Sequence, residues 1–155
     1  MNTTMLMNTT ILLVDDHDSV RDGVRRLLDP YPRLTVIGEA NDGRAAVRKV
    51  SELAPNVVIL DISMPLLDGI EATRQILAIN PETCVLILSM YSDKTSVSQA
   101  LAAGASGYLV KTSLAKELVN AIDTVLSGNR YLSQKIEHSM LVESLGYGMR
   151  ESIPA

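Results

Sequence analysis

Five short apolar runs, separated by longer amphipathic stretches, constrain the fold of this chain more than any other feature. The runs are rich in Val, Ile and Leu, and they occupy residues 11–14, 34–40, 57–60, 84–88 and 107–110. Runs of this length and composition are typical of strands that are buried on both faces of a sheet. The pattern therefore predicts a sheet whose two faces are both covered.

The stretches between these runs carry apolar residues at the spacing of an α-helix. In the first stretch, Val20, Val24 and Leu28 recur on one helical face. The same periodicity predicts four further helices, over residues 46–53, 69–79, 94–103 and 114–127. Each helix would present an apolar stripe to the sheet and a polar face to water.

Local signals mark where several of these helices begin and end. Pro30 predicts the end of the first helix, because proline cannot continue a helix. Ser113 is the predicted N-cap of the last helix, and Gly104 is the predicted glycine after the fourth. Strands and helices thus alternate five times, which predicts an α/β fold. We expect a doubly wound, five-stranded parallel sheet with helices on both faces.

Charge, cysteine content and hydropathy exclude several classes of protein. The net charge is −4 and no stretch is strongly basic, so we expect no direct nucleic-acid binding by this chain. The single cysteine, Cys84, excludes an intramolecular disulfide and is interpreted as a buried, inert thiol. No run is long enough for a membrane span, and residues 1–9 lack the positive charge of a signal peptide. We therefore expect a cytoplasmic protein without membrane contact.

Polar side chains stand directly at the ends of the apolar runs. Asp15 and Asp16 follow the first run, and Asp61 ends the third. Ser89 and Lys111 follow the fourth and fifth runs. In an open doubly wound sheet, ligands bind beyond the carboxyl ends of the strands. We therefore expect three carboxylates, a hydroxyl and an ammonium group to meet in one pocket.

Three carboxylates in one pocket repel one another unless a cation balances their charge. An all-oxygen, partly hydrated site suits Mg²⁺, with Mn²⁺ as a substitute, better than it suits zinc. A carboxylate beside such a cation is a usable nucleophile toward phosphorus and would form an aspartyl phosphate. The cation, Lys111 and a hydroxyl donor would share the charge of the phosphoryl oxygens. The pattern therefore predicts phosphoryl transfer to a carboxylate.

Each of these residues also has a simpler interpretation when it is taken alone. Asp16 could cap the first helix, and Lys111 could be an ordinary surface lysine. Asp61 could be a loop acid, although a charge that ends an apolar strand is costly without a partner. His17 follows the acid pair, and we interpret it as a loop residue and not as a metal ligand. The joint placement of the group at one sheet edge favours the functional interpretation.

Three segments of the chain resemble the signature segments of response-regulator receiver domains. They read Ile-Leu-Leu-Val-Asp-Asp-His at 11–17, Asp-Ile-Ser-Met-Pro-Leu-Leu-Asp-Gly at 61–69 and Gly-Ala-Ser-Gly-Tyr-Leu-Val-Lys at 104–111. The resemblance covers about residues 10–130. A later segment, Gly-Asn-Arg-Tyr-Leu-Ser at 128–133, resembles the NarL/FixJ (LuxR-type) branch of transcriptional regulators. The implied fold is flavodoxin-like, with strand order 2-1-3-4-5.

The resemblance implies a phospho-acceptor and a set of metal ligands. Asp61 matches the residue that accepts the phosphoryl group and also binds the metal. Asp16 matches the acid that binds the metal directly, and Asp15 matches the acid that holds a metal-bound water. Ser63 matches the position whose backbone carbonyl binds the metal.

The resemblance also implies a conformational switch. Ser89 matches the switch hydroxyl, Tyr108 the switch aromatic, and Lys111 the lysine that contacts the phosphoryl group. After phosphorylation, Ser89 is expected to move inward and to leave space into which Tyr108 rotates. Near the acceptor, we expect Asp68 to cap the third helix and Gly69 to relieve crowding.

An organisation and a set of partners follow from the same resemblance. Residues 1–9 would form a flexible leader, residues 10–130 the receiver domain, and residues 131–155 a helix and linker toward an absent output domain. A sensor histidine kinase would donate the phosphoryl group, and phosphorylation would favour a homodimer. DNA would be bound only through the missing helix-turn-helix domain, so we interpret the chain as truncated. The first helix carries Arg21, Arg25 and Arg26, which would either contact the kinase or form a solvated face.

Such a domain would catalyse only its own phosphorylation and dephosphorylation, and we do not expect a conventional enzyme. The alternative is a stand-alone receiver that acts as a protein-interaction module without phosphorylation. Two positions depart from the family pattern. Met90 follows the switch hydroxyl where a small residue is frequent, and we hypothesise that it slows access to the pocket. Thr112 follows Lys111 where many relatives have proline, so no cis peptide bond is expected there.

Overall fold

Strands and helices alternate along the chain, as the apolar periodicity predicts. The protein is described by a computed structural model that covers residues 8–64 and 66–136. The strands are β1 (Thr9–Val14), β2 (Leu34–Ala40), β3 (Val57–Asp61), β4 (Cys84–Ser89), β5 (Gly107–Val110) and β6 (Tyr131–Leu132). The α-helices are α1 (Asp18–Leu28), α2 (Gly43–Leu53), α3 (Gly69–Ile79), α4 (Lys94–Ala102) and α5 (Leu114–Leu126). Among the described helices, none combines the length and apolar character that a membrane span requires.

The sheet is parallel and has six strands in the order β2-β1-β3-β4-β5-β6. The predicted order 2-1-3-4-5 is therefore present, but the predicted count of five strands is wrong. Gly107 pairs with Tyr131, and Tyr108 pairs with Leu132. An edge strand presents unpaired N–H and C=O groups, and β6 satisfies part of that edge of β5.

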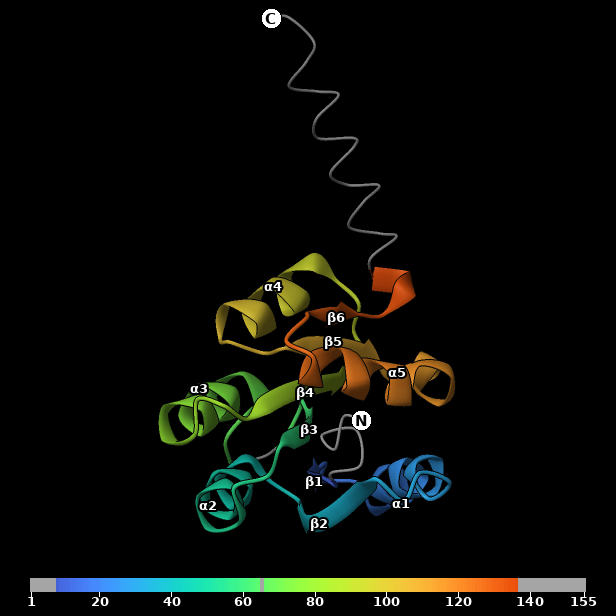
Figure 1. Ribbon diagram of the computed structural model, residues 1–155. Coiled ribbons are helices and arrows are strands. Elements are labelled where there is room, and N and C mark those ends of the chain that lie inside the picture. The colour runs from blue at the N-terminus through green and yellow to red at the C-terminus, as the bar shows by residue number, and fades with distance from the viewer. Residues whose placement is uncertain (1–7, 65, 137–155) are drawn as a thin grey trace, which may run out of the picture.

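Two apolar cores lie on the two faces of the sheet. Figure 1 shows α1 and α5 on one face, and α2, α3 and α4 on the other. Side chains alternate along β1 accordingly, since Ile11 and Leu13 pack in the α1/α5 core while Leu12 and Val14 pack in the opposite core. Burial on both faces explains why the strands read as continuous apolar runs.

The residues at the helix ends lie at the positions that the sequence predicts. The Asp68 carboxylate accepts a hydrogen bond from the Glu71 N–H at 2.9 Å, so the predicted cap of α3 is confirmed. Gly104 follows α4 with φ of +107°, as its assignment as a terminating glycine requires. Ser113 lies at the predicted N-cap position of α5, although its side chain makes no capping hydrogen bond. A 3₁₀ turn, η2 (Lys111–Ser113), leads into α5 at this point.

The predicted leader and C-terminal helix lie largely outside the described residues. Residues 1–7 and 137–155 are not described, so neither the predicted leader nor most of the predicted tail is tested. The described part of the tail contains β6 and a helical turn at residues 134–136. At the other end, β1 begins at Thr9, whose N–H donates to the carbonyl of Arg33.

Candidate functional site

The structure brings the three predicted acids together at the carboxyl edge of the sheet. Asp15 directly follows β1, and Asp61 is the last residue of β3. Asp16 and His17 lie in the loop after β1, and one ligand atom from each of these four residues lies within 4.8 Å of the others. Asp15 and Asp61 are only 2% and 3% exposed. The two nearly buried carboxylates of Asp15 and Asp61 therefore lie close to a third acid, Asp16, in the loop after β1.

Lys111 supplies the positive charge that this group of acids requires. Its Nζ lies 3.0 Å from Asp15 Oδ2 and 3.4 Å from Asp61 Oδ1. Lys111 lies at the end of β5 and begins η2, and its peptide bond to Thr112 is trans. The simpler interpretation of Lys111 as a solvated surface lysine is therefore wrong, because its side chain is only 15% exposed.

The surroundings of Asp61 disfavour the ionised form of its carboxyl group. Burial raises the pKa of its carboxyl, and the negative charge of Asp15 raises it further. Lys111 and the Ser63 N–H, 3.2 Å from Asp61 Oδ1, oppose this rise but do not cancel it. A carboxylate in such surroundings gains from any additional positive charge in the pocket.

His17 contacts both acids of its own loop, although its interpretation as a loop residue predicts no such contacts. Its Nδ1 lies 3.0 Å from Asp15 Oδ1 and 2.9 Å from Asp16 Oδ1. The hydrogen bond to Asp15 and the charges of both acids raise the pKa of the imidazole. His17 also occupies the N-cap position of α1 without a side-chain bond, so Asp16 does not cap that helix. The adjacency of His17 to two acids was the signal available in the sequence.

Gly69 allows the chain at the start of α3 to pass close to the end of β3. A Cβ on this residue would lie 2.4 Å from the carbonyl oxygen of Asp61 and 2.7 Å from the Cα of Ile62. The Gly69 N–H also donates to the Ile62 carbonyl at 3.0 Å. The expected role of Gly69 in relieving crowding is therefore confirmed.

The two predicted switch residues are connected through Tyr91. Ser89 is fully buried, and its Oγ accepts a hydrogen bond from the Tyr91 N–H at 3.0 Å. The Tyr108 hydroxyl donates to the Tyr91 carbonyl at 2.9 Å. Tyr108 is fully buried, and burial raises the pKa of its phenol. In this conformation Tyr108 already lies inward, and its movement on phosphorylation stays a prediction.

Two of the three arginines on α1 are engaged within the protein. Arg21 Nε lies 2.6 Å from Glu39 Oε1, and Arg21 also bonds to Asp18 and to the Asp15 carbonyl. Arg25 contacts the other carboxylate oxygen of Glu39 at 2.6 Å. These two side chains fasten α1 to β2, whereas Arg26 is exposed.

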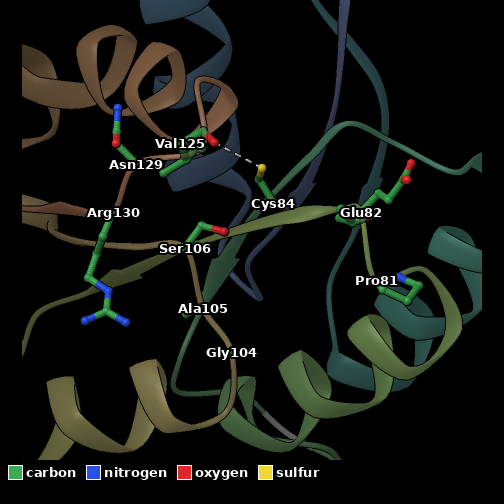
Figure 2. A pocket seen from close by; sticks show the side chains of 11 residues that line it. Pro81, Glu82, Cys84, Gly104, Ala105, Ser106, Val125, Asn129 and Arg130 are labelled. Atoms are coloured by element: carbon green, nitrogen blue, oxygen red, sulfur yellow. Dashed lines mark hydrogen bonds between the residues drawn. The ribbon is translucent and has the colours of Figure 1, made fainter.

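A hollow of about 340 Å³ lies at the opposite end of the strands, near the start of β4 (Figure 2). Cys84 lines it and is only partly buried, so the prediction of a buried thiol holds in part. Its Sγ donates to the Val125 carbonyl at 3.4 Å, and burial raises its pKa, as expected of an unreactive thiol. Figure 2 shows the charged ends of Glu82 and Arg130 directed away from Cys84. The hollow therefore lacks the convergent polar groups of the acidic site.

The fold and the acidic pocket match a known family. A family model of the response regulator receiver domain matches residues 11–123 of this chain. The chain therefore belongs to the response regulator receiver domain family. This assignment confirms the resemblance that the three signature segments indicated.

Relatives with similar sequences support the assignment to the LuxR-type branch. The chain is 38% identical over 133 residues to the transcriptional regulatory protein DegU of Brevibacillus brevis, covering 86% of this chain and 56% of DegU. It is 39% identical over 134 residues to the response regulator GacA of Pseudomonas protegens, covering 86% of this chain and 63% of GacA. The chain thus spans about three-fifths of the length of these relatives.

Solved structures show the same fold. A LuxR-family two-component response regulator from Aurantimonas sp. superposes with a TM-score of 0.85 at 39% identity. That match covers 89% of this chain and 99% of the other. The isolated receiver domain of RcsB from Salmonella enterica, solved with the phosphomimetic BeF₃⁻, has a TM-score of 0.78 at 25% identity, covering 84% and 97% of the two chains.

Proposed function

We propose that this receiver domain accepts a phosphoryl group on Asp61 and that the modification switches its conformation. The observation that carries the proposal is the position of the Asp61 carboxylate. It is buried at the end of β3, close to Asp15 and Asp16, with the Lys111 ammonium 3.4 Å away. A carboxylate held beside a cationic group is suited to attack phosphorus.

We further propose that a divalent cation, Mg²⁺ or Mn²⁺, belongs to this pocket. The donor set fits such an ion, because oxygen ligands are those that hard cations prefer. The carboxylates of Asp15, Asp16 and Asp61 and the backbone carbonyl of Ser63 would hold it. When bound, the cation would supply positive charge that stabilises the phosphoryl oxygens. The raised pKa of Asp61 supports the proposal, since Lys111 alone leaves the pocket with excess negative charge.

Residues of the chain itself would form the bond to phosphorus and hold the phosphoryl oxygens. A carboxylate oxygen of Asp61 would form the new bond to phosphorus, while the bond from phosphorus to the donor atom breaks. The donor atom leaves with the electron pair of that bond and takes up a proton. Lys111 would hold a phosphoryl oxygen, and the Ser89 hydroxyl would donate to another after leaving Tyr91.

The partners proposed for this domain follow from its family. A sensor histidine kinase in the cytoplasm would be the phosphoryl donor, and phosphorylation would favour a homodimer. The output would be DNA binding by a helix-turn-helix domain in the intact regulator. The names of the relatives support this output, because DegU is a transcriptional regulatory protein and one RcsB structure describes dimers bound to DNA.

Intact-protein mass spectrometry tests the proposal. The protein is incubated with acetyl phosphate and Mg²⁺, and Asp61→Asn is compared with a control at an exposed acid, Asp22→Asn. We expect the wild type and the control to gain one phosphoryl group, and Asp61→Asn or a chelator to abolish the gain. A gain in Asp61→Asn would overturn the assignment of the acceptor. No gain in the wild type from acetyl phosphate or a histidine kinase would favour a phosphorylation-independent interaction module.

A further inference from the structure

The segment from Tyr131 to Ile136, called the edge segment below, wraps around the open edge of the sheet. Figure 1 shows β6 beside β5, followed by a short helical turn near α4. Tyr131 packs against the α1/α5 core, whereas Leu132 and Ile136 pack in the opposite core. Ile136 is fully buried. The segment therefore contacts both faces of the fold next to β5, the strand that Lys111 directly follows.

A buried carboxylate on α5 fixes this segment. Glu117 is 7% exposed, and its Oε2 accepts hydrogen bonds from the Tyr131 hydroxyl at 2.7 Å and the Gln134 N–H at 2.9 Å. Its Oε1 is buried without a hydrogen-bond partner among the described residues. A half-satisfied buried carboxylate is a costly way to gain stability, because an apolar side chain would avoid the desolvation. The burial of Glu117 is therefore explained better by its role in positioning the edge segment than by a gain in stability.

A second buried polar group joins the edge segment to the end of β5. Ser133 is fully buried, and its Oγ accepts a hydrogen bond from the Val110 N–H at 2.9 Å. The Ser133 N–H donates to the Tyr108 carbonyl at 3.0 Å. Val110 directly precedes Lys111, whose ammonium contacts Asp15 and Asp61. Ser133 thus holds the backbone beside both the proposed switch aromatic and the phosphoryl-contacting lysine.

We propose that the edge segment is a latch that positions Lys111, with Glu117 and Ser133 as its positioning residues. This inference rests on the proposed function, since Lys111 is positioned for the phosphorylation of Asp61. Coupling between two sites is reciprocal. Docking of the latch therefore favours phosphorylation, and phosphorylation changes how firmly the latch is docked.

Phosphorylation rates test the positioning role. Ser133→Ala leaves the Val110 N–H without its acceptor, and we expect the initial rate with acetyl phosphate and Mg²⁺ to fall by about fivefold or more. Thr83→Val is the matched control, because it removes a buried hydroxyl that donates to the Pro55 carbonyl at the other end of β4. Glu117→Leu should act as Ser133→Ala does. Glu117→Gln retains an acceptor oxygen and should stay near the wild-type rate.

A double-mutant cycle separates positioning from general loosening of the fold. If Ser133 acts through Lys111, Ser133→Ala has no further effect on the rate in a Lys111→Met background. A structural defect would instead lower the rate by the same factor in both backgrounds, and that result would overturn the proposal. Circular dichroism and thermal unfolding establish that each variant is folded before its rate is compared.

Hydrogen exchange tests the reverse direction of the coupling. We expect amides of residues 131–136 to change their exchange rates on incubation with acetyl phosphate and Mg²⁺, and to remain unchanged in Asp61→Asn. Unchanged exchange in phosphorylated wild type, or a wild-type rate in Ser133→Ala, would overturn the latch. The two proposals fail differently. If the wild type gains no mass, the acceptor assignment is refuted. If the wild type is phosphorylated and Ser133→Ala and Glu117→Leu are phosphorylated at the same rate, only the latch is refuted.

Discussion

Gly69 lies against the backbone of Asp61, the proposed phospho-acceptor, so a single methyl group at this position would disturb the site. A Cβ would meet the Asp61 carbonyl oxygen at 2.4 Å, and backbone atoms cannot move aside as a flexible side chain can. We expect Gly69→Ala to lower the free energy of unfolding by about 1–3 kcal/mol in a urea titration. The initial phosphorylation rate should fall as well, because the loop that carries Ser63 must shift.

Gly23 provides the matched control for this substitution. It lies within α1, and a Cβ there would meet no atom within 4 Å. Gly23→Ala should therefore raise the free energy of unfolding by roughly 0.5–1 kcal/mol, since alanine loses less entropy in a helix. Equal effects of the two substitutions would show that the close contact at Gly69 is not what makes that position sensitive.

Met90 follows Ser89, the proposed switch residue, at the same edge of the sheet, and Met90 is 62% exposed. If its thioether slows the access of water to the pocket, Met90→Ala should raise the rate at which phosphorylated Asp61 is hydrolysed. The rate is followed by intact mass after the phosphodonor is removed, with Leu126→Ala as an exposed apolar control at the far end of α5. An unchanged lifetime in Met90→Ala would remove the hypothesis.

The sequence predicts those site residues that lie at the ends of strands. Asp15, Asp61 and Lys111 each end or follow an apolar run, and parallel strands bring those ends to one edge. The contacts of His17 and Arg21 were not predictable in this way. They depend on which direction a side chain takes from a loop or a helix, and apolar periodicity carries no information about that direction.

At the scale of elements, α1 and β2 are joined by a charge cluster centred on Glu39. Burial alone would raise the pKa of Glu39, but the hydrogen bonds and charges of Arg21 and Arg25 outweigh it and lower the pKa. A lowered pKa in the folded state means that the unfolded chain binds the proton more readily. The contribution of this cluster to stability is therefore complete above the unfolded pKa near 4.5 and is lost as the pH falls through the folded pKa.

Glu39→Gln tests this linkage. We expect it to cost about 1 kcal/mol at neutral pH, because a partly exposed ion pair with two arginines is lost. As the pH falls from neutral through the lowered folded-state pKa of Glu39, the wild type should lose more unfolding free energy than the variant does. Glu71→Gln is the control, since Glu71 faces Arg74 at 3.7 Å on an exposed surface. Parallel pH curves for the wild type and Glu39→Gln would contradict the assignment.

The elements that the sequence did not predict are the shortest ones. The β6 strand contains two residues, too few to show any period, so only its pairing with β5 reveals it. The η2 turn places Ser113 inside a continuous path from Lys111 to α5, which removes the need for a side-chain cap. The five longer strands and the five α-helices follow their apolar patterns, because burial against the sheet fixes which residues are apolar.

At the scale of the whole molecule, the arrangement that creates the site also weakens the fold. The doubly wound sheet brings Asp15 and Asp61 into a nearly buried position with one ammonium between them. The raised pKa of Asp61 means that its carboxyl holds a proton more tightly in the folded state than in the unfolded chain, so its ionisation at neutral pH reduces stability. A ligand that binds only the folded chain opposes this loss by mass action.

Thermal unfolding with and without Mg²⁺ tests this balance. At a concentration one hundred times the Kd, the cation should stabilise the wild type by about 2.7 kcal/mol, which corresponds to a rise in Tm of roughly 5–10 °C. Asp61→Asn removes one of the repelling charges, so its Tm without the cation should exceed that of the wild type, and its rise with the cation should be smaller. NaCl at equal ionic strength controls for screening. A wild-type Tm that responds equally to both salts would contradict a cation site built from these acids.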